Sequence, residues 1–101
     1  MSTSTTTMTD SLLSTPGEIL NEEFLRPFDI SRYRLAKAIG VSEAAIGEII
    51  KGKHAISTAM AYRLSKALGT TPEFWLNLQA DYDLLRFDPS TIGDITPLAS
   101  A

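Results

Sequence analysis

Apolar residues recur at helical spacing in five stretches of this chain, with glycine or proline between the stretches. Each stretch follows a serine or threonine that suits the N-terminus of a helix. The expected N-caps are Thr15, Ser31, Ser42, Ser57 and Thr71. The pattern therefore predicts an all-α domain of five helices.

The segment from Ser31 to Lys53 contains two of these helices with almost no loop between them. Gly40 and Gly52 stand where a left-handed residue would end each helix. The small Ala36, one turn before Gly40, allows the second helix to cross closely over the first. The inner face of the pair is expected to consist of Leu35, Ile39, Val41, Ile46 and Ile49. We predict a helix-turn-helix, whose second helix enters the major groove of DNA.

An ordinary αα-hairpin is the alternative interpretation of this segment. Capping and small residues at fixed offsets favour the helix-turn-helix. The geometry leaves five residues on the outer face of the second helix: Ser42, Glu43, Ala44, Gly47 and Glu48.

The first helix is predicted to begin with a capping box formed by Thr15 and Glu18, with Pro16 at its first position. Pro27 is expected to push Arg26 out of the helical region and so to end the helix. Ile19, Leu20 and Phe24 are expected to face the core. Three carboxylates, Glu18, Glu22 and Glu23, form an acidic ridge.

The last helix, from Thr71 to Phe87, is unusually rich in apolar residues. Its predicted core stripe is Phe74, Leu78, Tyr82 and Leu85. Trp75, Leu76 and Leu84 fall partly outside this stripe. We interpret them as a self-association surface, because aromatic residues concentrate in interface cores. The alternative is that Trp75 wraps the edge of the core.

The chain length of 101 residues suits one domain. Residues 1–14 are a Ser/Thr-rich leader that we expect to be disordered, residues 15–87 form the domain, and residues 88–101 are expected to be a flexible tail. The sequence has no cysteine, no apolar run long enough to span a membrane and no signal-peptide core. These features predict a cytoplasmic protein with no membrane partner.

The charge distribution favours a nucleic-acid partner even though the net charge is −3. Between residues 26 and 66 there are eight Lys and Arg residues against three Asp and Glu residues. The remainder of the chain has one base against nine acids. A basic centre can bind phosphates locally while the acidic ends repel them. The alternative is that these cations are only the solvated faces of helices.

Enzymatic chemistry has no support in the sequence. The single histidine, His54, lacks the partners that a catalytic dyad or a metal site needs. Asp81 and Asp83 are two residues apart on a helix and so point to different faces. We predict no catalytic residue, no metal and no cofactor. His54 is better explained as a phosphate contact beside Lys51 and Lys53, or as an exposed loop residue.

Three segments together resemble a known family. They are S-x-Y-R-L-A-K-A-I-G-V-S, I-x-E-I-I-K-G-K-H-A-I-S and R-L-S-K-A-L-G-T-T-P-E-F-W-L-N-L-Q-A-x-Y-D-L. A chain that has these three segments in this order resembles the HigA (VapI-type) antitoxins, which are Xre, lambda-repressor-like helix-turn-helix proteins. The resemblance implies a homodimer that binds operator DNA, represses its own promoter and neutralises an mRNA-cleaving HigB-type toxin.

The resemblance also implies roles for individual residues. Ser42, Glu43, Ala44, Gly47 and Glu48 would face base edges, and Arg32, Tyr33, Lys51 and Lys53 would lie near phosphates. We predict that Arg32→Ala weakens binding to specific and to scrambled DNA alike and reduces the salt slope by about one. We expect the acidic ridge to face the toxin, because opposite potentials speed association. The alternatives are a stand-alone Xre-type regulator and a protein-interaction module that no longer binds DNA.

Overall fold

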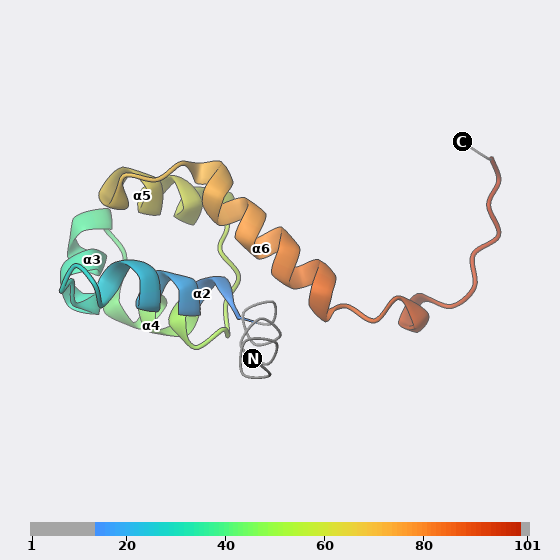
Figure 1. Ribbon diagram of the computed structural model, residues 1–101, viewed down its shortest axis with the longest axis horizontal. Coiled ribbons are helices and arrows are strands. Elements are labelled where there is room, and N and C mark those ends of the chain that lie inside the picture. Colours follow the sequence, from blue (N-terminus) through green and yellow to red (C-terminus); the bar gives the residue numbers. More distant parts are fainter. Residues whose placement is uncertain (1–13, 100–101) are drawn as a thin grey trace, which may run out of the picture.

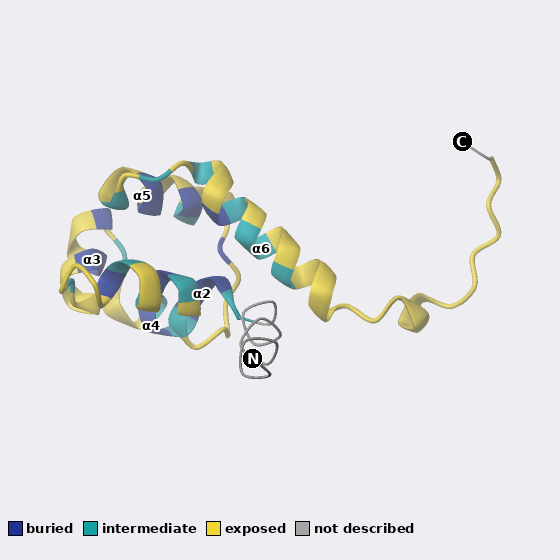
Figure 2. Cartoon of the chain, in the orientation of Figure 1, coloured by how far each residue is buried: buried dark blue, intermediate teal, exposed yellow. Residues whose placement is uncertain are grey.

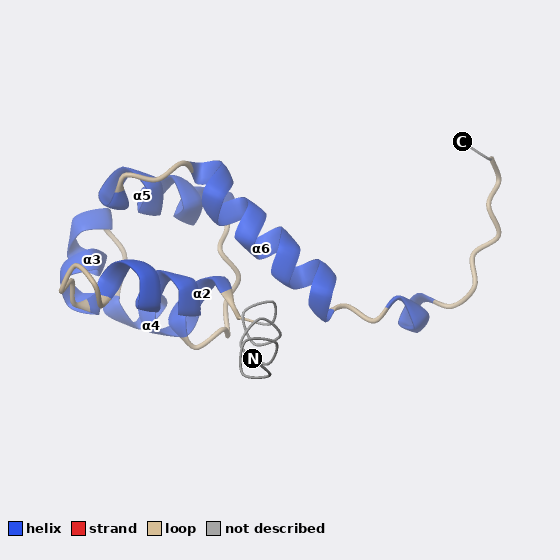
Figure 3. Ribbon diagram, in the orientation of Figure 1, coloured by secondary structure: helices blue, strands red, loops and turns tan. Residues whose placement is uncertain are grey.

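The structure is a computed structural model that describes residues 14–99 (Figure 1). Its elements are α2 (Pro16–Ile19), η1 (Leu20–Leu25), α3 (Arg32–Ile39), α4 (Glu43–Ile50), α5 (Thr58–Leu68), α6 (Pro72–Arg86) and η2 (Pro89–Ile92). Because α2 continues directly into η1, the two form one helix, and the predicted set of five helices is confirmed. The described residues contain no strand (Figure 3). All but Ser14 of the predicted leader lies outside the described residues.

Each helix begins at the residue that the sequence predicted. The Thr15 hydroxyl accepts a hydrogen bond from the Glu18 N–H at 3.1 Å, and the Glu18 carboxylate accepts one from the Thr15 N–H at 2.8 Å. The hydroxyls of Ser31, Ser42, Ser57 and Thr71 likewise accept from the N–H three residues later. Such caps satisfy backbone donors that have no partner inside the helix.

The first helix ends at Leu25, directly before Arg26 and Pro27, as predicted. The predicted conformation of Arg26 is wrong, because Arg26 keeps helical dihedral angles, with φ −66° and ψ −48°. The turns of η1 are wider than α-helical turns, since the Arg26 N–H donates to the Asn21 carbonyl five residues back at 3.0 Å. This bond outweighs the conformational bias of a residue before proline, and the neighbouring Leu25 is buried in the core.

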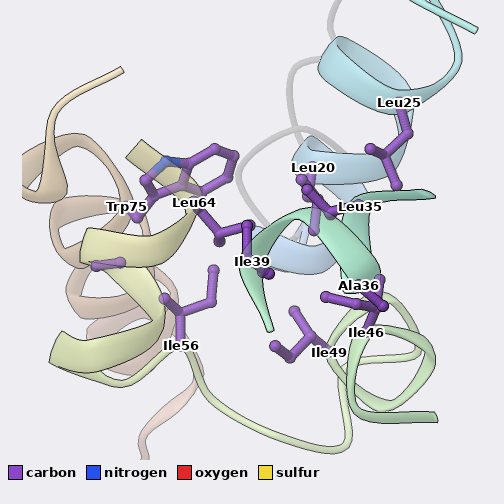
Figure 4. Packing of buried hydrophobic residues seen from close by; sticks show 11 residues of the cluster. Leu20, Leu25, Leu35, Ala36, Ile39, Ile46, Ile49, Ile56, Leu64 and Trp75 are labelled. Carbon is purple, nitrogen blue, oxygen red and sulfur yellow. The ribbon is translucent and has the colours of Figure 1, made fainter. Parts of the chain in front are cut away.

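Side chains from every long helix meet in one core (Figure 4). The largest fully buried side chains are Trp75, Leu20, Leu35, Ile46 and Leu64. Four of the five residues predicted for the inner face of the helix-turn-helix are buried, and Val41 is half-buried. The α3–α4 pair is therefore fixed against both its neighbours by apolar packing.

The predicted core stripe of α6 is only partly confirmed, since Leu78 packs against the core and Tyr82 is half-buried, but the centre of the stripe is wrong. Trp75 is fully buried, whereas Phe74 is 37% and Leu85 is 52% exposed. The Trp75 ring packs at 5.2 Å from the Phe24 ring and 4.9 Å from the Phe74 ring, between ring centroids. Its Nε1–H donates to the Thr70 hydroxyl at 2.7 Å. When a helix is apolar on several sides, helical spacing alone does not predict which side faces the core. For α6, contact with the other helices decides which side is buried.

The far end of α6 leaves the bundle and continues into an exposed segment (Figures 1 and 2). Leu84 is 76% exposed here, whereas Leu76 packs against the core. Beyond α6, the Asp88 carboxylate accepts hydrogen bonds from the Ser90 hydroxyl and N–H, which lower the pKa of Asp88 below its ordinary value. The exposed apolar residues of this region are Leu84, Leu85, Phe87, Ile92, Ile95 and Leu98.

Candidate DNA-binding surface

The turn between α3 and α4 has the geometry that a helix-turn-helix needs. Gly40 adopts the left-handed conformation, with φ 73°, and the Val41 N–H donates to the Ala36 carbonyl at 3.0 Å. A side chain at Gly40 would be strained at this φ. The chain therefore reverses within two residues, and Ser42 at once caps α4.

The outer face of α4 is open to solvent at its N-terminal turn and partly covered further along. Ser42, Glu43 and Ala44 are exposed, and Glu48 is half-buried. Gly47, which was predicted to lie on the same surface, is buried. The reason is tertiary: Nη1 of Arg32 lies 3.3 Å from the point where a Cβ of Gly47 would stand. Arg32, the first residue of α3, thus covers the position on α4 where Gly47 has no side chain.

The predicted phosphate contacts are exposed and lie on two sides of α4. Arg32 and Tyr33 open α3, and the Arg32 guanidinium lies against Gly47 in the middle of α4, whereas the other three follow the C-terminus of α4: Lys51, Lys53 and His54. Lys37 lies one turn after Tyr33, with Nζ 5.6 Å from the ring centre. Cations therefore flank the exposed face of α4, as a surface that binds a DNA backbone requires.

A hollow of about 300 Å³ lies directly beside this face. Ala44 and Glu48 of α4 line one side, and His54, Ser57 and Met60 line the other. The hollow contains mainly apolar surface near α4 together with the imidazole of His54. It brings His54 and the exposed face of α4 into one concave surface.

Two positioning residues were not found from the sequence. The Gln79 side-chain oxygen accepts a hydrogen bond from the Ile56 N–H at 2.8 Å and so ties the segment after α4 to α6. Gln79 lies one turn after Trp75, so a correct rotation of α6 would have indicated it. The Arg63 guanidinium donates to the Ile39 carbonyl at the end of α3. No sequence signal distinguished Arg63 from the other cations.

The carboxylates of the predicted acidic ridge have different surroundings. Glu18 is engaged in the capping box, and Glu22 forms an ion pair with Arg26 at 3.2 Å. Glu23 is exposed and has no ion pair within the described part of the chain. The ridge therefore presents less free negative charge than its sequence suggested.

Comparison with known proteins decides the family. A helix-turn-helix family model matches residues 22–75. Virulence-associated protein I of Dichelobacter nodosus is 41% identical over 87 residues, which is 84% of this chain and 81% of the relative. The solved structure of Pseudomonas aeruginosa antitoxin HigA with the higBA promoter is 40% identical, has a TM-score of 0.78 and is covered over 99% of its chain and 86% of this one. The chain belongs to the HigA-type helix-turn-helix family.

A further HigA-type structure supports the same assignment. Antitoxin GraA in complex with its operator is 41% identical, with a TM-score of 0.75 over 86% of this chain and 92% of that one. The HigA-type family consists of DNA-binding proteins rather than enzymes. Within residues 14–99, no helix is long and apolar enough to cross a membrane.

Proposed function

We propose that this chain is a HigA-type antitoxin that binds operator DNA as a dimer, represses its own promoter and neutralises an mRNA-cleaving HigB-type toxin. The observation that carries the proposal is the exposed face of α4 with cations on both sides, on a fold shared with antitoxins solved on a promoter and on an operator. The double-stranded DNA would meet Ser42, Glu43, Ala44 and Glu48 in its major groove, and Lys51, Lys53 and His54 at its backbone.

The proposed dimer uses the end of α6. Of the three residues expected there, Trp75 is buried inside the chain and Leu76 packs against the core, so neither offers a free surface. Leu84 does, together with Leu85 and Phe87, which are more than half exposed. Several large exposed apolar residues within one short segment favour a protein interface. In a two-fold dimer, the two α4 helices would lie about 34 Å apart, which is one turn of DNA, or a multiple of that distance.

The function is tested by binding to the DNA immediately upstream of the protein's own reading frame. We expect the upstream duplex to bind more tightly than a scrambled duplex of equal length, with two chains per inverted repeat at saturation. Fluorescence anisotropy across a salt series measures both affinities. Lys51→Ala should weaken binding to both duplexes similarly and reduce the salt slope of the affinity by about one, since it removes one phosphate contact. Equal or absent binding to the two duplexes would contradict the proposed repressor.

The proposed toxin contact is the acidic ridge, with Glu22 and Glu23 as its informative members. Reversing Glu18 would also remove the capping box, so it is left unchanged in the test. We expect Glu22→Lys with Glu23→Lys to abolish inhibition of the toxin's RNA cleavage, because a basic toxin surface would be repelled.

The matched control reverses the same number of charges elsewhere. Glu73→Lys with Asp81→Lys changes two exposed acids of α6. The control should neutralise the toxin normally, and both double variants should bind promoter DNA like the parent. Neutralisation that survives reversal of Glu22 and Glu23 would show that the ridge is only a solvated face.

A further inference from the structure

The recognition helix of this protein lacks the side chains that read purine bases most strongly. Its sequence, Glu43 to Ile50, contains no Arg, Lys, Asn or Gln. The strongest contacts in the major groove are bidentate hydrogen bonds from Arg or Lys to guanine and from Asn or Gln to adenine. Glu43 and Glu48 instead place two negative charges on the face that would meet DNA.

A side chain from another helix covers α4 at Gly47, where α4 has no side chain of its own. At Gly47 the Arg32 guanidinium lies in close contact with the position of a side chain, 3.3 Å from the ideal Cβ position. Arg32 is the first residue of α3 and directly follows the N-cap Ser31, whose hydroxyl accepts a hydrogen bond from the Arg34 N–H. The guanidinium therefore stands on the surface of α4 about where a side chain of α4 itself would begin.

The donors of this guanidinium are not consumed within the protein. In the part of the chain that the structure describes, the Arg32 side chain has no hydrogen bond and no ion pair, and the residue is exposed. Its planar fork matches the O6 and N7 acceptors of guanine. A contact with a phosphate would not require the Arg32 guanidinium to lie over the middle of the recognition helix.

We propose that Arg32 reads a guanine in the major groove and is the main determinant of operator specificity, with Gly47 leaving the space for it. This inference rests on the proposed binding of operator DNA. It replaces the expectation that Arg32 meets only a phosphate. Specificity would then come from α3 acting across α4, rather than from a side chain of α4.

The test compares three variants on the upstream duplex and the scrambled duplex. Arg32→Lys keeps the charge but loses the planar fork, and Gly47→Leu keeps every charge but occupies the space of the guanidinium. We expect both to lower the preference for the upstream duplex by about tenfold to a hundredfold per half-site, with nearly unchanged salt slopes. Arg34→Ala removes a charge two residues along α3, about 200° around the helix, and should leave the preference unchanged.

A modified base identifies the contact itself. Replacing single guanines of the upstream duplex by 7-deazaguanine removes the N7 acceptor. One guanine in each half-site should be sensitive to this change with the parent protein and insensitive with Arg32→Ala, which has no side-chain donor left. Circular dichroism at 222 nm should show equal helix content for all variants.

Two different failures can be told apart. If the parent prefers the upstream duplex and Arg32→Ala preserves that preference and the 7-deazaguanine sensitivity, Arg32 reads no guanine and this inference is overturned alone. If the parent shows no preference for the upstream duplex, the proposed repressor function fails and the inference fails with it.

Discussion

Replacing Trp75 by alanine should lower the free energy of unfolding by about 3–5 kcal/mol. The indole is fully buried, lies between the rings of Phe24 and Phe74, and has its one polar atom satisfied by Thr70. Alanine would leave a large cavity where α6 meets the first helix. Because domains of this size are stable by only about 5–15 kcal/mol, the variant should be close to unfolding at physiological temperature.

Urea unfolding followed by circular dichroism measures this loss, since Trp75 is the only tryptophan and its fluorescence disappears with it. Leu84→Ala is the matched control, because Leu84 is on the same helix but 76% exposed; at low protein concentration it should cost less than about 0.5 kcal/mol. A cost below about 1 kcal/mol for Trp75→Ala, or one that depends strongly on protein concentration, would indicate an interface role instead of a core role.

Replacing Gly17 by alanine should destabilise the domain by about 3 kcal/mol or more, which is at the upper end for overpacking. A Cβ at Gly17 would stand 1.8 Å from the Ile49 carbonyl oxygen and 2.7 Å from the Ile50 Cα. Both are backbone atoms of α4, so no side chain can move aside. The first helix and α4 would have to separate, and binding to promoter DNA should weaken because α4 is displaced.

Gly47→Ala provides the control for this variant. Gly47 also lies in a helix and is buried, but its Cβ would meet only the end of the flexible Arg32 side chain, at 3.3 Å. Alanine is favoured over glycine in a helix by about 1 kcal/mol, so stability should be unchanged or slightly higher. Urea midpoints of the two variants measure the contrast. Equal midpoints would mean that α2 and α4 can separate at little cost.

Local chemistry explains what could be predicted from the sequence. The capping residues Thr15, Ser31, Ser42, Ser57 and Thr71 act on N–H groups three residues away. Gly40 ends α3 through its own backbone conformation. These interactions need no distant partner, and together with the family resemblance they were sufficient to predict five helices and a helix-turn-helix.

Tertiary contacts decided the remainder. The burial of Trp75 depends on how α6 rotates against the first helix and α5, and several faces of α6 are apolar enough for either rotation. The burial of Gly47 depends on Arg32, which is 15 residues earlier in the chain and belongs to another helix. The sequence by itself determined where each helix begins and that α3 and α4 form a helix-turn-helix pair. Only the packing of α3 on α4 placed the Arg32 guanidinium beside Gly47, because that contact joins residues that no local pattern connects.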